Sequence, residues 1–168
     1  MRLFFALWPD DAVRAALAAV AASVAARATG RTVPAAKLHV TLSFLGEVPD
    51  SRLPAAMDAA ATVRGRPFEL TVDTVGSFRA ARVAWAGFSS VPPELASLQS
   101  RLEVSLRQRE FVLEDRPYSA HATLARRIER SVPREAMPPI RWKVRDFVLV
   151  RSEAGRGNYN VMERWKLG

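Results

Sequence analysis

The chain contains two histidines, and each of them begins the same four-residue pattern, His-x-Thr-Leu, at positions 39–42 and 121–124. Successive side chains of a β-strand point to opposite faces, so His39 shares a face with Thr41, and His121 shares a face with Thr123. The apolar residues between and after them anchor each strand from behind. The sequence therefore predicts two strands that each present an imidazole beside a hydroxyl.

The chain is long enough for one domain with a substantial core, because about half of its 168 residues are hydrophobic. Cysteine is absent, which excludes disulfides and thiolate metal sites and fits a reducing compartment. The apolar start at 1–8 stops at Pro9 without a signal-peptide cleavage pattern, and the alanine-rich stretch at 12–28 is too short to span a bilayer. We expect a cytoplasmic protein that is not bound to a membrane and acts as a monomer.

The chain is basic, with 25 Lys and Arg against 17 Asp and Glu and a formal net charge of +8. A basic surface attracts polyanions such as RNA through counterion release and long-range steering. An arginine- and alanine-rich composition with three lysines is equally typical of a GC-rich genome. The net charge therefore leaves both explanations open.

Hydrophobic periodicity predicts the order strand, helix, strand, helix, hairpin, helix, strand, hairpin. We expect strands at 2–8, 38–45, 68–73, 83–88, 119–125, 142–149 and 159–165, and helices between Asp10 and Gly30, from Asp50 or Ser51 to Val63, and from Pro92-Pro93 to Leu106. A turn at 76–82 joins the first hairpin, and a change of phase at Arg145-Asp146 predicts a bulge. This order is typical of an α+β domain of mostly antiparallel sheets with outer helices. Since the motif recurs once in each half, we expect two similar lobes facing each other across a central cleft.

Two histidines in one cleft supply what hydrolysis of a phosphodiester requires. A neutral imidazole can take a proton from water, and an imidazolium can give a proton to the departing oxygen. An ordinary histidine pKa near ~6.5 allows both forms at neutral pH. The hydroxyls of Thr41 and Thr123 can donate hydrogen bonds to the non-bridging phosphate oxygens, where charge grows in the transition state.

Other chemistries fit this pattern less well. Zinc sites use three or four protein ligands, and no Asp, Glu or Cys cluster stands near either histidine in the sequence, so we expect no metal. A Ser-His-Asp triad would use one histidine and leave the second motif without a role. No glycine-rich phosphate loop is present, and no cofactor is indicated.

The chain resembles the 2H phosphoesterases, and in particular the bacterial and archaeal RNA 2',3'-cyclic phosphodiesterases once called 2'-5' RNA ligases. The resemblance covers nearly the whole length. It is carried by the stretches at 2–9, 37–46 and 121–126, and by the closing segment from Arg151-Ser152 through Tyr159 to Trp165.

The resemblance implies a bilobal fold with pseudo-twofold symmetry and hydrolysis of a terminal RNA 2',3'-cyclic phosphate to a 2'-phosphomonoester. It implies that His39 is the proton donor to the leaving 3' oxygen and that His121 is the base that activates water. Thr41 and Thr123 correspond to the hydroxyls that hold the phosphate.

Phe44 and Arg126 stand where members of the family contact the nucleotide. Strict strand alternation places both on the face opposite the histidines, so a core position for Phe44 is at least as well supported. Ala120 replaces a proline that is usual before the second motif, and this change removes no catalytic group.

Two other functions remain open. One is an RNA- or nucleotide-binding module with little turnover, although such a module needs no pair of proton-transfer groups. The other is the joining of RNA ends through a 2'-5' linkage, the reverse reaction, which water at high concentration disfavours. The expected ligand is an RNA with a 2',3'-cyclic phosphate end or a small cyclic nucleotide, and no protein partner is evident.

Overall fold

The structure is a computed structural model that describes residues 1–153, 155 and 157–168. Within these residues the chain forms nine strands and three α-helices, with two short 3₁₀ turns. The strands are β1 (Arg2–Leu7), β2 (Arg31–Thr32), β3 (Val40–Glu47), β4 (Phe68–Phe78), β5 (Val83–Gly87), β6 (Ala122–Arg126), β7 (Glu135–Val144), β8 (Asp146–Ser152) and β9 (Tyr159–Lys166). The helices are α1 (Asp11–Ala28), α2 (Leu53–Ala61) and α3 (Pro93–Gln108), and the 3₁₀ turns are η1 (Ala35–Lys37) and η2 (Asp50–Arg52). Among the described residues, no helix is both long and apolar enough to cross a lipid bilayer.

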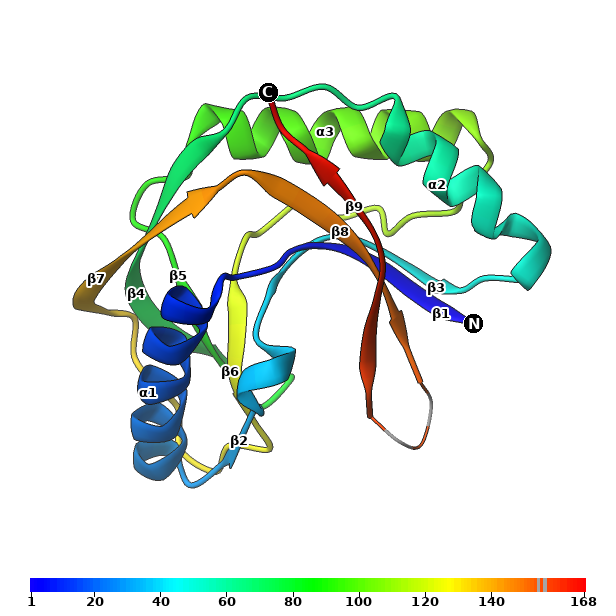
Figure 1. Cartoon of the computed structure of the whole chain (residues 1–168). Coiled ribbons are helices and arrows are strands. Elements are labelled where there is room, and N and C mark those ends of the chain that lie inside the picture. The colour runs from blue at the N-terminus through cyan, green and yellow to red at the C-terminus, as the bar shows by residue number, and fades with distance from the viewer. Residues whose placement is uncertain (154, 156) are drawn as a thin grey trace.

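All strands belong to one antiparallel sheet in the order β7-β4-β5-β6-β3-β1-β8-β9, with β2 added beside β6 (Figure 1). The two motif strands, β6 and β3, are neighbours at the centre of this order. Three further strands lie outward of each, so the two halves of the sheet have the same arrangement and are related by an approximate twofold rotation. The predicted α+β fold with pseudo-twofold symmetry is confirmed.

The two halves also exchange helices. The unit β1-α1-β3 matches β5-α3-β6, yet α1 packs on β5, β6 and β7, and α3 packs on β3. In Figure 1, α1 lies at the lower left beside the strands of one half, while α2 and α3 lie along the top. Each half of the sheet is therefore covered by a helix that the other half supplies.

Local sequence explains the two long helices. The side chain of Asp10 accepts a hydrogen bond from the backbone N–H of Val13 at 2.9 Å and caps α1. Thr29 is left-handed with φ 51°, and the N–H of Gly30 reaches the carbonyl of Ala25 at 2.9 Å to end it. In α3 the predicted apolar stripe is fully buried and consists of Leu95, Leu98, Leu102 and Leu106. Burial of each leucine contributes roughly 2 kcal/mol of transfer free energy.

Strand β1 divides its side chains between two environments. Leu3, Phe5 and Leu7 point into the main core. Phe4 and Ala6 point to the other face, where they form a smaller apolar cluster with Val148 and Val150 of β8 and the partly buried Trp8 and Tyr159. This second face is the one on which the first histidine lies.

Several expected boundaries were wrong, including the start of the strand expected at residue 142, because β7 already begins at Glu135. The motif strands begin at Val40 and Ala122, so each histidine immediately precedes its strand, and β3 starts late because η1 follows Pro34. Helix α2 begins at Leu53, after the 3₁₀ turn η2 has used Asp50 and Ser51. Strand β4 continues to Phe78, which confines the hairpin turn to residues 79–82.

The expected bulge at Arg145-Asp146 is instead a change of strand partner. Strand β7 pairs with β4 in one half of the sheet, whereas β8 pairs with β1 in the other half. Residue Arg145 lies between them, and its carbonyl accepts the N–H of Leu167 at 2.8 Å. The alternation changes phase there because the chain passes from one half to the other.

Candidate active site

The imidazole of His39 is held by both of its nitrogens. Nδ1 lies 2.6 Å from the backbone carbonyl oxygen of Lys37, and Nε2 lies 3.1 Å from the hydroxyl of Thr41. A carbonyl oxygen only accepts, so Nδ1–H donates to it, and in the neutral ring Nε2 accepts from Thr41. The predicted pairing of His39 with Thr41 on one face is therefore present.

Three aromatic rings surround His39. Trp8 stacks on it with a centroid distance of 5.8 Å, Phe4 lies at 4.8 Å, and Tyr159 meets it edge-on at 5.6 Å. Burial in this setting lowers the pKa of His39 to about 4, and the nearby positive groups act in the same direction. His39 is therefore neutral at pH 7 when no ligand is bound.

His121 repeats the same backbone anchor in a more open setting. Its Nδ1 donates to the carbonyl of Ser119 at 2.8 Å, again two residues earlier in the chain. The edge of Phe78 approaches its ring with a centroid distance of 5.1 Å. Burial lowers the pKa of His121 as well, assisted by the charges of Arg116 and Arg126.

The sheet places the two motifs side by side on neighbouring strands. Val40 of β3 pairs with Ala122 of β6 in antiparallel register. Extending this register by one residue on each side sets His39 opposite Thr123 and Thr41 opposite His121. The charge of His121 contributes to the low pKa of His39, as expected for neighbouring groups. The four predicted side chains thus form one constellation across the centre of the sheet.

Each motif contains a one-residue bulge at its leucine. Along β1, Ala6 pairs with Thr41 and the next residue, Phe5, pairs with Ser43, so Leu42 is the extra residue. Along β5, Trp85 pairs with Thr123 and Ala84 pairs with Ala125, so Leu124 is the extra residue. Both leucines are buried, and so are the residues that follow them.

The bulges reverse the alternation of side chains, and the expectation that Phe44 and Arg126 face away from the histidines was wrong. Phe44 pairs with Phe4, which contacts His39, and Phe44 is 36% exposed. Arg126 pairs with Val83, two residues from Trp85 on the same strand face, and its charge lowers the pKa of both histidines. A one-residue bulge reverses the alternation of the residues that follow it, so both Phe44 and Arg126 join the site face.

Side chains and backbone groups from elsewhere hold the bulged segments. The N–H of Val33 donates to the carbonyl of Leu124 at 2.8 Å. The hydroxyl of Tyr118 donates to the carbonyl of Thr41 at 2.8 Å, and the buried amide of Gln99 reaches that of Leu42 at 3.5 Å. Tyr118 precedes the second motif, so its hydrogen bond ties one half-site to the other.

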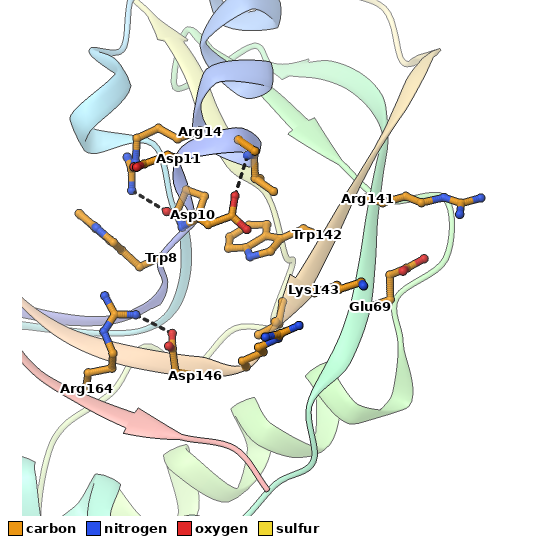
Figure 2. A pocket seen from close by; sticks show the side chains of 15 residues that line it. Trp8, Asp10, Asp11, Arg14, Glu69, Arg141, Trp142, Lys143, Asp146 and Arg164 are labelled. Carbon is orange, nitrogen blue, oxygen red and sulfur yellow. Dashed lines mark hydrogen bonds and ion pairs between the residues drawn. The ribbon is translucent and has the colours of Figure 1, made fainter.

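Arg14 of α1 supports the segment that leads to His39, and no sequence pattern points to this role. Its guanidinium donates to the carbonyls of Ala35, Leu38 (3.2 Å) and Pro9 (3.3 Å) and lies 5.0 Å from the ring of Trp8. Trp8 and Arg14 also line a cavity of about 960 Å³, with the Asp146–Arg164 ion pair elsewhere on its wall (Figure 2). Neither histidine lines this cavity.

Trp8, Phe4 and Tyr159 are the other residues that sequence reasoning missed. They come from the two ends of the chain and meet only through the pairing of β1 with β8 and of β8 with β9. No spacing rule connects them to His39. In the described part of the chain, no three His, Asp or Glu side chains gather in a way that would hold a metal ion.

Comparison with known proteins identifies the family. The family model described as LigT like Phosphoesterase matches residues 7–85. An RNA 2',3'-cyclic phosphodiesterase of Escherichia coli is 33% identical over 172 residues, covering 99% of this chain and 96% of that protein. The chain belongs to the LigT-like phosphoesterase family. The resemblance inferred from the paired histidine motifs is confirmed.

Two further LigT-like proteins agree with this assignment. An RNA 2',3'-cyclic phosphodiesterase of Thermus thermophilus is 31% identical over 182 residues, covering 99% of this chain and 90% of that protein. The crystal structure of Escherichia coli LigT complexed with 3'-AMP superimposes with a TM-score of 0.88 at 32% identity, covering 99% of this chain and 97% of that one. The LigT-like fold is thus shared over the whole length.

Proposed function

We propose that this LigT-like phosphoesterase hydrolyses RNA 2',3'-cyclic phosphate ends to 2'-phosphomonoesters by acid–base catalysis with two histidines. One observation carries the proposal: both imidazoles are fixed through Nδ1 to a backbone carbonyl, which leaves each Nε2 for proton transfer. In the first half-site the hydroxyl of Thr41 lies 3.1 Å from Nε2 of His39. The relatives named RNA 2',3'-cyclic phosphodiesterase supply the substrate class.

In this reaction His121 Nε2 takes a proton from water, and the water oxygen forms a bond to phosphorus. The bond from phosphorus to the 3' oxygen breaks, and His39 Nε2 gives its proton to that oxygen, leaving the phosphate on the 2' oxygen. The assignment of acid and base follows the family resemblance. Thr41 and Thr123 donate to the non-bridging oxygens, and no cofactor takes part.

His39 must carry a proton to act as the acid, although burial keeps it neutral in the free protein. The cyclic phosphate brings a negative charge to the site, which favours the imidazolium and raises the pKa of His39 in the complex. Arg126 and Phe44, which the bulges turn to the site face, would contact the nucleotide. Substrate binding then prepares the acid for its role.

We also infer that residues 1–168 work as a single 2H phosphoesterase domain of two similar lobes, as a monomer in the cytoplasm. The continuous sheet and the exchanged helices support one domain. The absence of cysteine from the sequence is consistent with a reducing compartment.

The test is hydrolysis of a short RNA ending in a 2',3'-cyclic phosphate, in excess EDTA, with separation of 2'- from 3'-phosphate products. Wild type should yield the 2'-phosphate, and His39→Ala and His121→Ala should each be slower by at least ~100-fold. Circular dichroism and thermal melting would show that both variants fold. If wild type binds this RNA and leaves it intact, a binding module replaces the enzyme as the better explanation.

A further inference from the structure

Four arginines gather where β6 ends and its antiparallel neighbours β2 and β5 begin, beyond the second motif: Arg31, Arg82, Arg126 and Arg127. Arg31 of β2 lies directly opposite Arg126 of β6 in the antiparallel register. Like charges in directly opposed positions of a sheet are destabilising. Among the described residues, the ion pairs include neither of these arginines. The fold therefore keeps two like charges opposite one another beside the site face, and no ion pair among the described residues offsets them.

Arg82 and Arg127 enlarge this concentration of charge. With Arg31 they line a hollow of about 560 Å³ whose lining contains one carboxylate, that of Glu129. Arg82 and Arg127 are both left-handed, with φ 53°, a conformation that non-glycine residues rarely adopt. Through its Nε, Arg82 donates to the carbonyl of Ile128 at 3.1 Å, which fixes its guanidinium at the edge of the hollow.

The C-terminus of α1 also borders this hollow and offers a different reason for cations there, since they favour the negative end of a helix. Two of the carbonyls in its last turn, however, already have backbone partners. The carbonyl of Ala28 accepts the N–H groups of Glu129 at 2.9 Å and Arg130 at 3.0 Å, and that of Ala25 accepts the N–H of Gly30. Capping of α1 therefore does not require four guanidinium groups.

We propose that Arg31, Arg82 and Arg127 bind the phosphodiester groups of the RNA that precede its cyclic end. This inference rests on the proposed function. Arg126 links the two places, because its charge reaches both histidines and it pairs with Arg31. From Thr123 to Arg126 is about 10 Å along the strand, so a chain held at the histidines passes the arginines within its next few nucleotides. Bound phosphates would relieve the repulsion between the arginines.

The test compares two substrates that share the reacting group, a nucleoside 2',3'-cyclic phosphate and an RNA octamer with the same end. In Arg31→Gln/Arg127→Gln, the KM for the octamer should rise about 10-fold, while kcat/KM for the mononucleotide changes less than about twofold. The plot of log KM against log salt concentration for the octamer should lose about 0.7 in slope for each arginine removed.

The matched control is Arg66→Gln/Arg107→Gln, which removes the same charge from exposed positions before β4 and on α3. Its KM for the octamer should rise much less than 10-fold, because this variant loses the same net charge but none of the arginines of the hollow. The proposal is overturned if the first variant matches this control, or if it only lowers the melting temperature and affects both substrates equally. Failure of wild type to hydrolyse either substrate would instead overturn the proposed function.

Discussion

The two half-sites share their backbone geometry and differ in what surrounds them. In each, Nδ1 of the histidine donates to the carbonyl two residues earlier, a threonine follows on the same side, and the leucine forms a bulge. Yet three aromatic rings, those of Trp8, Phe4 and Tyr159, enclose His39. Among the described residues, the ring of His121 has one aromatic neighbour, Phe78. The local fold thus sets the tautomer in both halves, and the environment sets each pKa separately.

The position five residues after each histidine also combines a shared backbone geometry with different side chains. The bulge brings this position to the site face in both halves, where it is Phe44 in one and Arg126 in the other. One half therefore presents an exposed ring and the other a guanidinium. A nearly symmetrical backbone thus presents two unlike groups on the site face, which under the proposed function would suit a substrate with a base on one side and a phosphate chain on the other.

Removal of the threonine hydroxyls should have the largest effect of the changes that probe this comparison. We expect Thr41→Val and Thr123→Val each to lower kcat by about 100-fold, the size typical of one lost donor to a developing charge. Thr41→Val should also change the pH profile, because Thr41 holds Nε2 of His39. Measurement of kcat from pH 5 to 9 would show this.

Thr41→Ser and Thr123→Ser are the matched controls, since they retain the hydroxyl. Both should recover most of the lost activity. A Thr41→Val enzyme with the same pH profile as Thr123→Val would show that the hydrogen bond to His39 does not influence its titration.

The link between the halves should have a smaller effect. Tyr118→Phe removes the hydroxyl that donates to the carbonyl of Thr41 and leaves the ring in place. We expect kcat to fall about 5- to 10-fold with little change in KM, because the two half-sites lose their fixed spacing. Urea unfolding should show a stability loss of about 1 kcal/mol.

Ser105→Ala is the control for this variant. Ser105 is buried on α3, and its hydroxyl donates to the carbonyl of Ala59 at 2.9 Å and accepts from the guanidinium of Arg109 at 2.9 Å. It should lose at least as much stability as Tyr118→Phe, at unchanged kcat. Equal kcat values for Tyr118→Phe and wild type would mean that the cross-link only stabilises the fold.

The remaining prediction concerns how stability depends on pH, and it involves no change in the reaction rate. The pKa of His39 is about 4 in the folded protein and near 6.5 when unfolded, so the unfolded chain binds the proton first as the pH falls. The stability that neutral His39 provides is complete above about pH 6.5 and is lost between about pH 6.5 and 4, by up to roughly 1.4 kcal/mol per pH unit. Urea unfolding of wild type and His39→Gln at several pH values would measure this difference.

His121→Gln sharpens the comparison between the halves. Burial also lowers the pKa of His121, so its loss should flatten the same curve in the same direction. We expect the flattening to be smaller than for His39→Gln, because fewer rings enclose His121. Equal curves for the two variants would contradict the contrast between the half-sites.

Much of this molecule was predictable from periodicity, and the failures have a common cause. The leucine stripe of α3 and the pairing of each histidine with its threonine follow from spacings within one element. The bulges at Leu42 and Leu124 were not predictable, because a leucine inside a buried strand looks the same in the sequence whether or not it has a partner on the neighbouring strand. Phe44 and Arg126 were therefore placed on the wrong face.

The aromatic surroundings of His39 were beyond sequence reasoning for a different reason. Trp8 and Tyr159 are 151 positions apart and meet through strand pairing that no local pattern encodes. Likewise, the crossing of the chain at Arg145 resembled a bulge, since both break the alternation at one point. Periodicity reports where a side chain points, and it does not report which strand lies beside it.

The exchange of helices between the two halves determines how this molecule unfolds. Because α1 covers strands of the second half and α3 covers a strand of the first, neither half keeps its core if the other unravels. We expect a single cooperative unfolding transition and no independently stable fragment from either half of the chain. A hinge between the motifs would have to break these same contacts, so an RNA end enters a site whose two histidines are already in position.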